Sequence, residues 1–341
     1  MLWRSRITEL ITMAIRADMN LADPLFEPAP KAAPSRDGFG KALVELGEKD
    51  PNVWVATADV SESTRTHWFA EKFPKRFVQI GVAEQNLAGV AAGIAACGKT
   101  VFMSAYAVFS PGRNWDQIRV SICYNDVPVK IHGSHSGLTV GPDGASHQAL
   151  EDIAITRVLP NMVVLAPADA EEARKATIAA AKLPGPVYIR TCREKMPVFT
   201  TDKTPFEVGK ANVYRDGKDV AVFACGAEVY EALKAAEELS KEGIDAAVID
   251  IHTIKPIDSA AIEEWARKTG LLVTVEDHQV NGGMGSAVAE VVTSTYPAPV
   301  VRHGVYDRFC ESGEPFELLK KYRLDGAGIA EVARKAMEKK K

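Results

Sequence analysis

Residues 77–98 read FVQIGVAEQNLAGVAAGIAACG, a short β-branched strand followed by a helix without a polar face. This order of elements is typical of a parallel α/β sheet, in which helices cover both faces of the strands. A helix that is apolar on all sides and rich in glycine and alanine is expected to be buried and closely packed. One carboxylate, Glu84, stands at its amino end. The stretch therefore predicts a buried helix with an acid at its start.

Two explanations of Glu84 remain open from the residues alone. An acid in the first turn of a helix interacts favourably with the helix dipole, and this is the commonest reason for one. At the end of a buried helix, however, a carboxylate is either paired or used in chemistry, because burying an unpaired charge is costly. In open parallel sheets, ligands bind beyond the carboxyl ends of the strands, which is where Glu84 falls. The position therefore marks a candidate site.

The same alternation of strand-like and helix-like segments extends in both directions from this stretch. Strand-like runs such as NVWVATADV (52–60) and PVYIRTC (186–192) are separated by helix-like ones. Short β-branched strands that alternate with helices predict a parallel, doubly wound sheet. After a polar stretch, the alternation returns at VAVFACG (220–226) and continues to a basic helix at the end. The predicted fold class is therefore α/β, with two doubly wound domains.

We expect three parts along the chain. Residues 1–33 are predicted to form a helix, over 1–20, followed by a Pro/Ala-rich arm. The first domain is expected to span 34–200 and the second, smaller domain 201–341, with the break near 195–215. The arm is either the remnant of a linker or a segment that wraps a partner, and the sequence leaves both open.

Composition limits the class of protein. The 341 residues are 46% hydrophobic and 25% charged, which is ordinary for a globular protein long enough to form two cores. A net charge of −4 gives no indication of binding to nucleic acid or to a membrane. The five cysteines form no CxxC pair, which indicates reduced thiols rather than a disulfide or zinc framework. With no signal-peptide pattern and no apolar run long enough to span a bilayer, we expect a cytoplasmic protein.

Several separated motifs, in the same order, resemble those of the transketolase family. From about residue 35 onward the chain resembles the second half of transketolase, with a pyrimidine-binding domain and a C-terminal domain. This family serves pentose phosphate metabolism, and relatives act on other sugar phosphates. The motifs are ATADVSES (56–63), GVAEQN (81–86), YAVF (106–109), HSGLTVGPDGASHQALEDIA (135–154), RTCREKMP (190–197) and VEDHQVNGGMGSAV (275–288).

The resemblance gives Glu84 a catalytic role with thiamine diphosphate. A glutamate at this position hydrogen-bonds N1′ of the cofactor's aminopyrimidine and favours the imino tautomer, which removes the proton from C2 of the thiazolium. Burial disfavours the charged form of an acid, and this suits a group that handles a proton. A flat aminopyrimidine also needs an aromatic wall. The resemblance implies that Phe109 forms this wall with Tyr106 nearby, and that Asp59 helps to organise the cofactor pocket across a dimer.

The glycine-rich loop after residue 134 carries His135, Asp143 and His147. Such a loop is often only a connector, and the spacing of these three residues matches no strong metal-ligand pattern. By resemblance, however, all three bind substrate. His147 is expected to contact the hydroxyl beside the donor's carbonyl and to take part in catalysis, Asp143 to contact the 2-hydroxyl region, and His135 to contact the substrate further out. Histidine suits this work because it donates, accepts and transfers protons near neutral pH.

Three further residues match positions that hold the sugar phosphate in this family. They are Arg36, Ser63 and Arg193. A fork of guanidinium donors fits such an anion well, although each residue taken singly would be expected at an ordinary surface position. The resemblance therefore implies phosphorylated sugars as substrates.

The cofactor's diphosphate and its Mg²⁺ need a second site, which the family places on the preceding domain in a GDG motif with a later asparagine. The Asp-Gly pairs of this chain lack both the leading glycine and the asparagine, and there is no P-loop. The resemblance therefore implies that the metal ligands lie on a partner. We expect the chain to be the C-terminal subunit of a split transketolase, joined by an N-terminal subunit in an α2β2 assembly. Such an enzyme transfers a two-carbon ketol unit from a ketose phosphate to an aldose phosphate.

Three other functions stay open. The β subunit of a 2-oxoacid dehydrogenase E1 component has a similar length and architecture and also carries the activating glutamate, but GPDGASHQALEDIA (141–154) resembles a sugar-handling loop. A non-catalytic regulatory homologue would not be expected to keep the acid, the histidines and the arginine together. A generic nucleotide-binding domain would need a phosphate-binding loop, which this sequence lacks.

Overall fold

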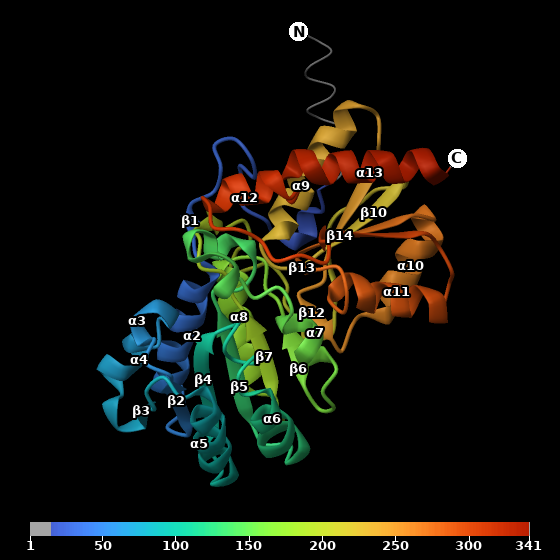
Figure 1. The fold of residues 1–341 in the computed structure, drawn as a ribbon. Coiled ribbons are helices and arrows are strands. Elements are labelled where there is room, and N and C mark those ends of the chain that lie inside the picture. Colours follow the sequence, from blue (N-terminus) through green and yellow to red (C-terminus); the bar gives the residue numbers. More distant parts are fainter. Residues whose placement is uncertain (1–14, 341) are drawn as a thin grey trace.

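The computed structural model describes residues 15–340 and arranges them as two large sheets flanked by helices, with a small two-stranded sheet besides (Figure 1). The first sheet has seven strands in the order β12-β6-β7-β5-β4-β2-β3. Six of them pair in parallel, whereas β12 runs antiparallel to β6. The strands are β2 (Val53–Thr57), β3 (Phe77–Gln79), β4 (Thr100–Tyr106), β5 (Val129–Ser134), β6 (Val163–Leu165), β7 (Val187–Arg190) and β12 (Thr253–Lys255).

Helices cover both faces of this sheet. On one face α2 and α8 pack against each other over a core that includes Phe39, Phe102 and Leu165. On the other face α5 packs against β4 and against the π-helix η3, with Leu87 and Ile118 in the core. The helical elements of this half are α2 (Ser35–Lys49), α3 (Ser61–Thr64), α4 (His67–Lys72), η2 (Pro74–Arg76), α5 (Glu84–Ala96), α6 (Trp115–Gln117), η3 (Ile118–Tyr124), η4 (Leu138–Ser146), α7 (Asp152–Arg157) and α8 (Ala170–Ala181).

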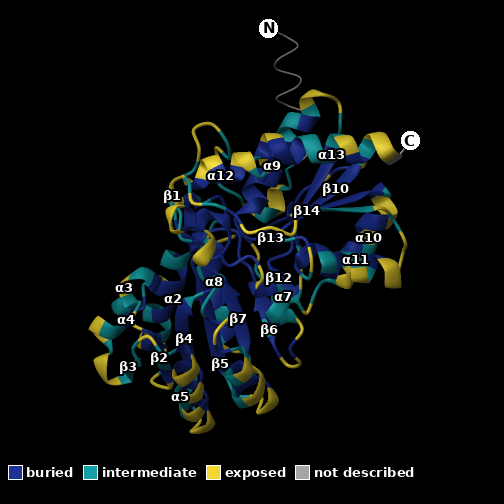
Figure 2. Ribbon diagram, viewed as in Figure 1, coloured by how far each residue is buried: buried dark blue, intermediate teal, exposed yellow. Residues whose placement is uncertain are grey.

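The second sheet has five strands in the order β14-β13-β10-β11-β9, all parallel except β9. Helix α13 packs on α9, and α10 packs on α11. The strands of both sheets are largely buried (Figure 2). The elements are β9 (Asn212–Arg215), β10 (Val220–Ala224), α9 (Glu228–Lys241), β11 (Ala246–Asp250), α10 (Ser259–Thr269), β13 (Leu272–Gln279), α11 (Met284–Ser294), β14 (Val300–Val305), α12 (Pro315–Lys321) and α13 (Gly326–Lys340).

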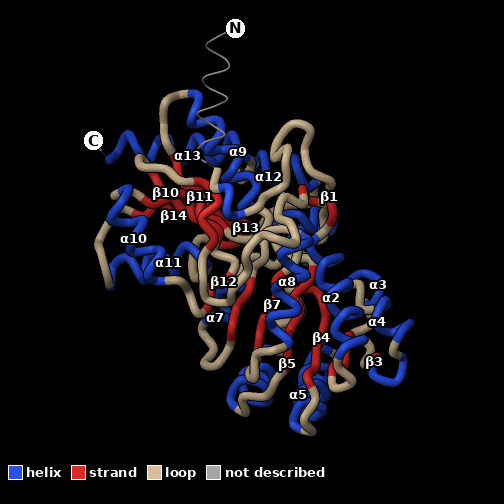
Figure 3. Tube along the Cα trace, turned by 180° about the vertical axis from the view of Figure 1, so that it is seen from behind, coloured by secondary structure: helices blue, strands red, loops and turns tan. Residues whose placement is uncertain are grey.

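The α/β class and the two doubly wound units predicted from the sequence are confirmed, but the two units are more closely joined than the alternation of elements indicated. The segment DAAVIDIHTIKP divides between the sheets, since β11 belongs to the second sheet and β12, only a few residues later, pairs with β6 of the first. Figure 3 shows β12 extending toward the strands of the first sheet. One buried cluster also includes side chains from both units, among them Tyr188 and Phe223.

The amino-terminal arm lies on the second unit of its own chain. Most of the helix expected over residues 1–20 falls outside the described residues, and the described part holds a β-bridge at Ile15 and the 3₁₀ turn η1 (Ala17–Met19). The arm then packs against the second core through Phe26, and Tyr230 donates a hydrogen bond to the carbonyl of Leu25 at 3.0 Å. At its end, β1 (Ala32–Ala33) pairs with β8 (Met196–Pro197).

The composition of α5 predicted a helix that is buried on every side. In the structure, one side of α5 is exposed. Leu87, Ala88 and Ala91 face the sheet and are buried. Gly89 and Gly93 are exposed, and no heavy atom lies within 4 Å of the place where a Cβ would be added to either. The expectation was wrong because composition reports only that a face is apolar, and this chain by itself covers one side of the helix.

No helix among residues 15–340 combines the length and the hydropathy that crossing a bilayer requires.

A buried pair of acids connects the two units. Glu172 lies in the first turn of α8, Asp250 ends β11, and the Tyr214 hydroxyl lies 3.2 Å from a carboxyl oxygen of each acid. Burial raises the pKa of Glu172 to about 7. Burial and the neighbouring Glu172 raise the pKa of Asp250 well above its usual value. The pair therefore holds a proton that the two acids would release on unfolding.

We expect this proton to make the folded state less stable as pH rises between about 5 and 7. A raised pKa in the folded state contributes stability that is present below the unfolded pKa and is lost as pH rises through the folded one. One proton corresponds to a slope of up to about 1.4 kcal/mol per pH unit in the free energy of unfolding. Urea unfolding across this range should show the slope in wild type and a flatter one in Glu172→Gln, because the amide donates to Asp250. The exposed Glu264→Gln is the control, and an unchanged slope in Glu172→Gln would contradict the prediction.

Candidate active site

Glu84 is the first residue of α5 and is 3% exposed. No side chain caps the helix at the preceding residue, Ala83. The Glu84 carboxylate accepts a hydrogen bond from Arg113 at 3.0 Å, and its backbone carbonyl accepts one from Asn114 at 3.1 Å. Both partners follow the end of β4, so the turn after this strand closes over the start of α5. The acid is therefore buried and paired with a cation that the sequence had not singled out.

Four rings lie together beside this acid. Tyr106 stacks on His135 with 4.0 Å between ring centroids, and Phe109 meets His147 edge-on at 5.3 Å. Tyr106 also lies 6.2 Å from both Phe109 and His147. The Arg113 guanidinium carbon lies 4.8 Å from the centroid of Phe109. The four aromatic side chains predicted for the cofactor and substrate are thus one cluster, which Arg113 joins to Glu84.

His135 is held as a neutral acceptor. Arg36 can only donate, so its 3.0 Å contact with Nε2 of His135 makes that nitrogen the acceptor and places the proton on Nδ1. Nδ1 then donates to the Ser134 hydroxyl at 2.9 Å. Burial, together with the positive charges of Arg36 and Arg193, lowers the pKa of His135 to about 2. The proton-transfer role that makes histidine suitable near neutral pH is therefore closed to His135 in this arrangement.

A hollow of about 310 Å³ beyond His135 is lined by four cationic side chains. Arg36 donates to the carbonyl of Ser63 at 2.8 Å. Arg193 donates to the carbonyl of Val140 at 2.8 Å and lies 3.6 Å from the Asp143 carboxylate. Burial and the nearby Arg65 lower the pKa of Arg36, as expected where like charges converge. The cations are Arg36, Arg65, Arg193 and Lys195, and the acids of the lining are Asp37, Glu194 and Glu314.

Comparison with known proteins places these features in a family. Residues 31–198 match the transketolase pyrimidine-binding domain, and residues 209–329 match the transketolase C-terminal domain. A transketolase C-terminal section from Methanocaldococcus jannaschii is 46% identical over 307 residues, which are 89% of this chain and 96% of that protein. The chain belongs to the transketolase family.

Two other relatives are also transketolase subunits of similar extent. A 6-deoxy-6-sulfo-D-fructose transketolase subunit of Clostridium sp. is 39% identical over 305 residues, which are 89% of this chain and 95% of that subunit. A solved structure described as a split-gene transketolase, an inactive β4 tetramer, is 48% identical with a TM-score of 0.84. The match covers 89% of this chain and 98% of the chain in that structure.

Among residues 15–340, Asp59 makes no hydrogen bond or ion pair with the ring cluster, although β2 pairs with β4 up to Thr57 and Ser104. Asp59 follows β2, is exposed, and has a left-handed backbone with φ of 60°. Its amide donates to the Gln79 side chain at 2.7 Å, and within residues 15–340 its carboxylate has no partner. The role implied for Asp59 lies across a dimer, so it stays a prediction.

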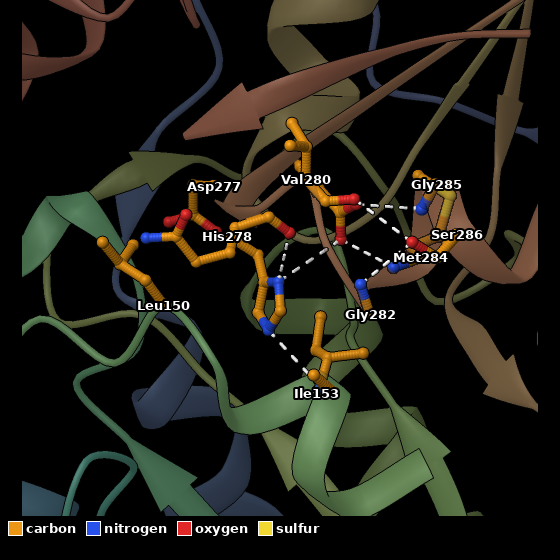
Figure 4. Close-up of polar contacts among 12 residues, drawn as sticks. Leu150, Ile153, Asp277, His278, Val280, Gly282, Met284, Gly285 and Ser286 are labelled. Atoms are coloured by element: carbon orange, nitrogen blue, oxygen red, sulfur yellow. Dashed lines mark hydrogen bonds and ion pairs between the residues drawn. The ribbon is translucent and has the colours of Figure 1, made fainter. Parts of the chain in front are cut away.

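The glycine-rich turn of the second unit contacts the first unit (Figure 4). Glu276 accepts hydrogen bonds from the amides of Met284 and Gly285 at 2.6 and 2.9 Å, at the start of α11. His278 is fully buried and accepts a hydrogen bond from the Ala154 amide at 3.4 Å, at the start of α7. These contacts hold the start of α11 against β13 and connect the second unit to α7.

Three site residues were missed in the sequence. Arg65 and Lys195 each stand two positions after a residue that was identified, Ser63 and Arg193, and this spacing could have indicated a wider basic site. Arg113 carried no such signal, because its contacts come from a turn that brings it back over α5. No cluster of three or more metal-ligating side chains occurs within the described part of the chain.

Proposed function

We propose that this chain is the C-terminal subunit of a split transketolase, which transfers a two-carbon ketol unit from a ketose phosphate to an aldose phosphate with thiamine diphosphate. The observation that carries the proposal is the buried Glu84 carboxylate beside the face of Phe109, with a planar guanidinium bonded to one and lying over the other. An aminopyrimidine can bind Glu84 and Phe109 in the same way, because it is planar and bears an N–H donor. The residues therefore fit this half of the cofactor.

Different residues of the chain are proposed to bind the cofactor and the substrate. The bound cofactor supplies a thiazolium carbon that carries the ketol unit. Glu84 holds the proton at the ring nitrogen N1′, and Phe109 orients the ring by stacking. His147 lies edge-on to Phe109, where it can hydrogen-bond a substrate hydroxyl. His135 is fixed as a neutral group by Ser134 and Arg36, so it positions the substrate rather than titrating.

The basic hollow supports an anionic end on the sugar. By resemblance, Arg36 and Arg193 match positions that hold phosphate in the family, and Arg65 and Lys195 line the same hollow. The lining holds four cations and three acids, and Arg65 pairs with Asp37 at 2.7 Å, so the cations that remain are Arg36, Arg193 and Lys195. Charge-assisted bonds to guanidinium groups are strong and directional, so a terminal phosphate or sulfonate suits this end of the site.

The uncovered face of α5 supports a partner. Gly89 and Gly93 expose their helix to solvent, and nearby Val82 and Tyr124 are 72% and 84% exposed. An apolar face of this kind on an active-site helix is costly to leave in water. We propose that an N-terminal transketolase subunit covers it and brings the ligands for Mg²⁺ and diphosphate, in an assembly of two copies of each. The inactivity of the β4 tetramer named above is consistent with this requirement.

Reconstitution tests the proposal. The chain is mixed with a separately encoded N-terminal transketolase subunit, thiamine diphosphate and Mg²⁺, and ketol transfer is assayed beside 2-oxoacid decarboxylation. We expect transfer by the pair and none by either subunit alone. A phosphorylated donor should exceed its unphosphorylated analogue about 10- to 100-fold in kcat/KM, because hydrogen bonds to charged groups contribute about 1.5–3 kcal/mol. Decarboxylation without transfer would favour a 2-oxoacid dehydrogenase subunit, and turnover by this chain alone would exclude the split enzyme.

A further inference from the structure

Arg113 holds an unusual position for an exposed side chain. Its guanidinium donates to the Glu84 carboxylate at 3.0 Å and lies over the Phe109 ring at 4.8 Å, yet the side chain is 52% exposed. Among residues 15–340, no other side chain bonds this carboxylate. The two groups proposed to hold an aminopyrimidine are therefore both engaged by one cation.

We infer that Arg113 is a placeholder in the cofactor site. Its guanidinium occupies the position that the aminopyrimidine takes, and it moves away when that ring binds. The inference rests on the proposed function. A guanidinium resembles the ring in the respects that matter here, since it is planar and presents N–H donors at its edge. Two planar groups cannot share one face of Phe109 and one oxygen of Glu84. Binding of the ring therefore requires Arg113 to move.

The local structure allows this movement without a change of backbone. Asn114, the next residue, is buried and anchors the turn by donating to the Glu84 carbonyl and to the Ser110 hydroxyl, both at 3.1 Å. These contacts do not involve the Arg113 side chain. Because about half of that side chain already faces solvent, it can swing outward while Asn114 holds the turn against α5.

The arrangement also gives the buried Glu84 carboxylate a partner within the chain. An unpaired carboxylate that is 3% exposed would be costly, and Arg113 supplies the missing countercharge. The same contact lowers the apparent affinity for the ring, because only the fraction of molecules with Arg113 displaced can bind it. Arg113 is thus a positioning residue that protects the acid and competes with the cofactor.

The test uses the full chain and the pyrimidine half of the cofactor, 4-amino-5-hydroxymethyl-2-methylpyrimidine, whose binding needs neither diphosphate site nor metal. Affinity is measured by titration calorimetry or by ligand-observed NMR. We expect Arg113→Met to bind the fragment roughly threefold to tenfold more tightly than wild type, the range for loss of a half-exposed ion pair and a cation–π contact. Methionine keeps an unbranched side chain at this position and removes the guanidinium, with its charge and its N–H donors, from Glu84 and from the face of Phe109. Arg119→Met, at an exposed position on η3, is the matched control and should bind like wild type.

A second variant separates this inference from the proposed function. Adding Glu84→Gln to Arg113→Met should weaken binding of the fragment, which places the ring at the acid. If Arg113→Met gains no affinity but Glu84→Gln still weakens binding, the placeholder role is wrong and the cofactor site stands. If Glu84→Gln has no effect, or Arg113→Met shows no binding, the ring does not bind at this acid and both fail. A purely structural Arg113 would change unfolding by urea without changing the affinity.

Discussion

Glu84→Gln is expected to lower kcat of the reconstituted pair by about 10²- to 10⁴-fold, the usual contribution of a positioned acid or base. Glutamine is nearly isosteric and can still meet a ring nitrogen, but it cannot hold and return a proton there. Because Glu84 is buried and contacts Arg113 through its carboxylate, the change also removes a charge pair without leaving a cavity. KM for the sugar substrates should change little, since Glu84 is proposed to contact the cofactor alone.

The control for this experiment is Glu71→Gln, at an exposed position on α4. It should leave kcat unchanged, and both variants should assemble with the partner to the same mass in size-exclusion chromatography. If Glu84→Gln keeps more than about a tenth of wild-type activity, the chain does not use this acid in catalysis. Such tolerance is what a regulatory homologue would show, so the same measurement decides between the two functions.

The predictable part of the fold is the part set by local pattern. The run FVQIGV, followed by a helix of alanine and glycine, indicated a parallel strand and a packed helix, and both occur as β3 and α5. The pairing of β12 with β6 had no local signal, because HTIK reads like a continuation of the strand before it. Which sheet such a segment joins depends on packing between units, and this is a long-range property.

The predictable part of the site followed from motifs rather than from chemistry. Resemblance identified Glu84, Phe109, His135 and Arg36, and the structure brings these to one edge of the first sheet. It could not show that His135 would be neutral, because that depends on how deeply His135 is buried and on the positive charge of Arg36 beside it. Side chains that meet through turns, and the protonation that follows, become visible only with the fold.

Arg190→Met is expected to lower the free energy of unfolding by about 3–5 kcal/mol, because it leaves two buried carboxylates without a countercharge. Arg190 is 4% exposed and ends β7. Its Nε donates to Asp152 at 3.0 Å, and another nitrogen donates to Asp277 at 2.5 Å. Asp152 also accepts from the Tyr188 hydroxyl at 2.7 Å. Since Asp277 lies on β13 of the second unit, the network holds the two units together.

Urea unfolding followed by circular dichroism measures this loss, with Arg267→Met as the control. Arg267 is exposed and pairs with Glu263 one helical turn away, so its loss should cost less than about 1 kcal/mol. If the network acts through charge balance, adding Asp152→Asn and Asp277→Asn to Arg190→Met should recover much of the stability, because neutral amides are far cheaper to bury. A loss for Arg190→Met no larger than that of Arg267→Met would mean that the two acids take up protons at little cost. The junction of the units would then depend on apolar packing and on β12 rather than on this arginine.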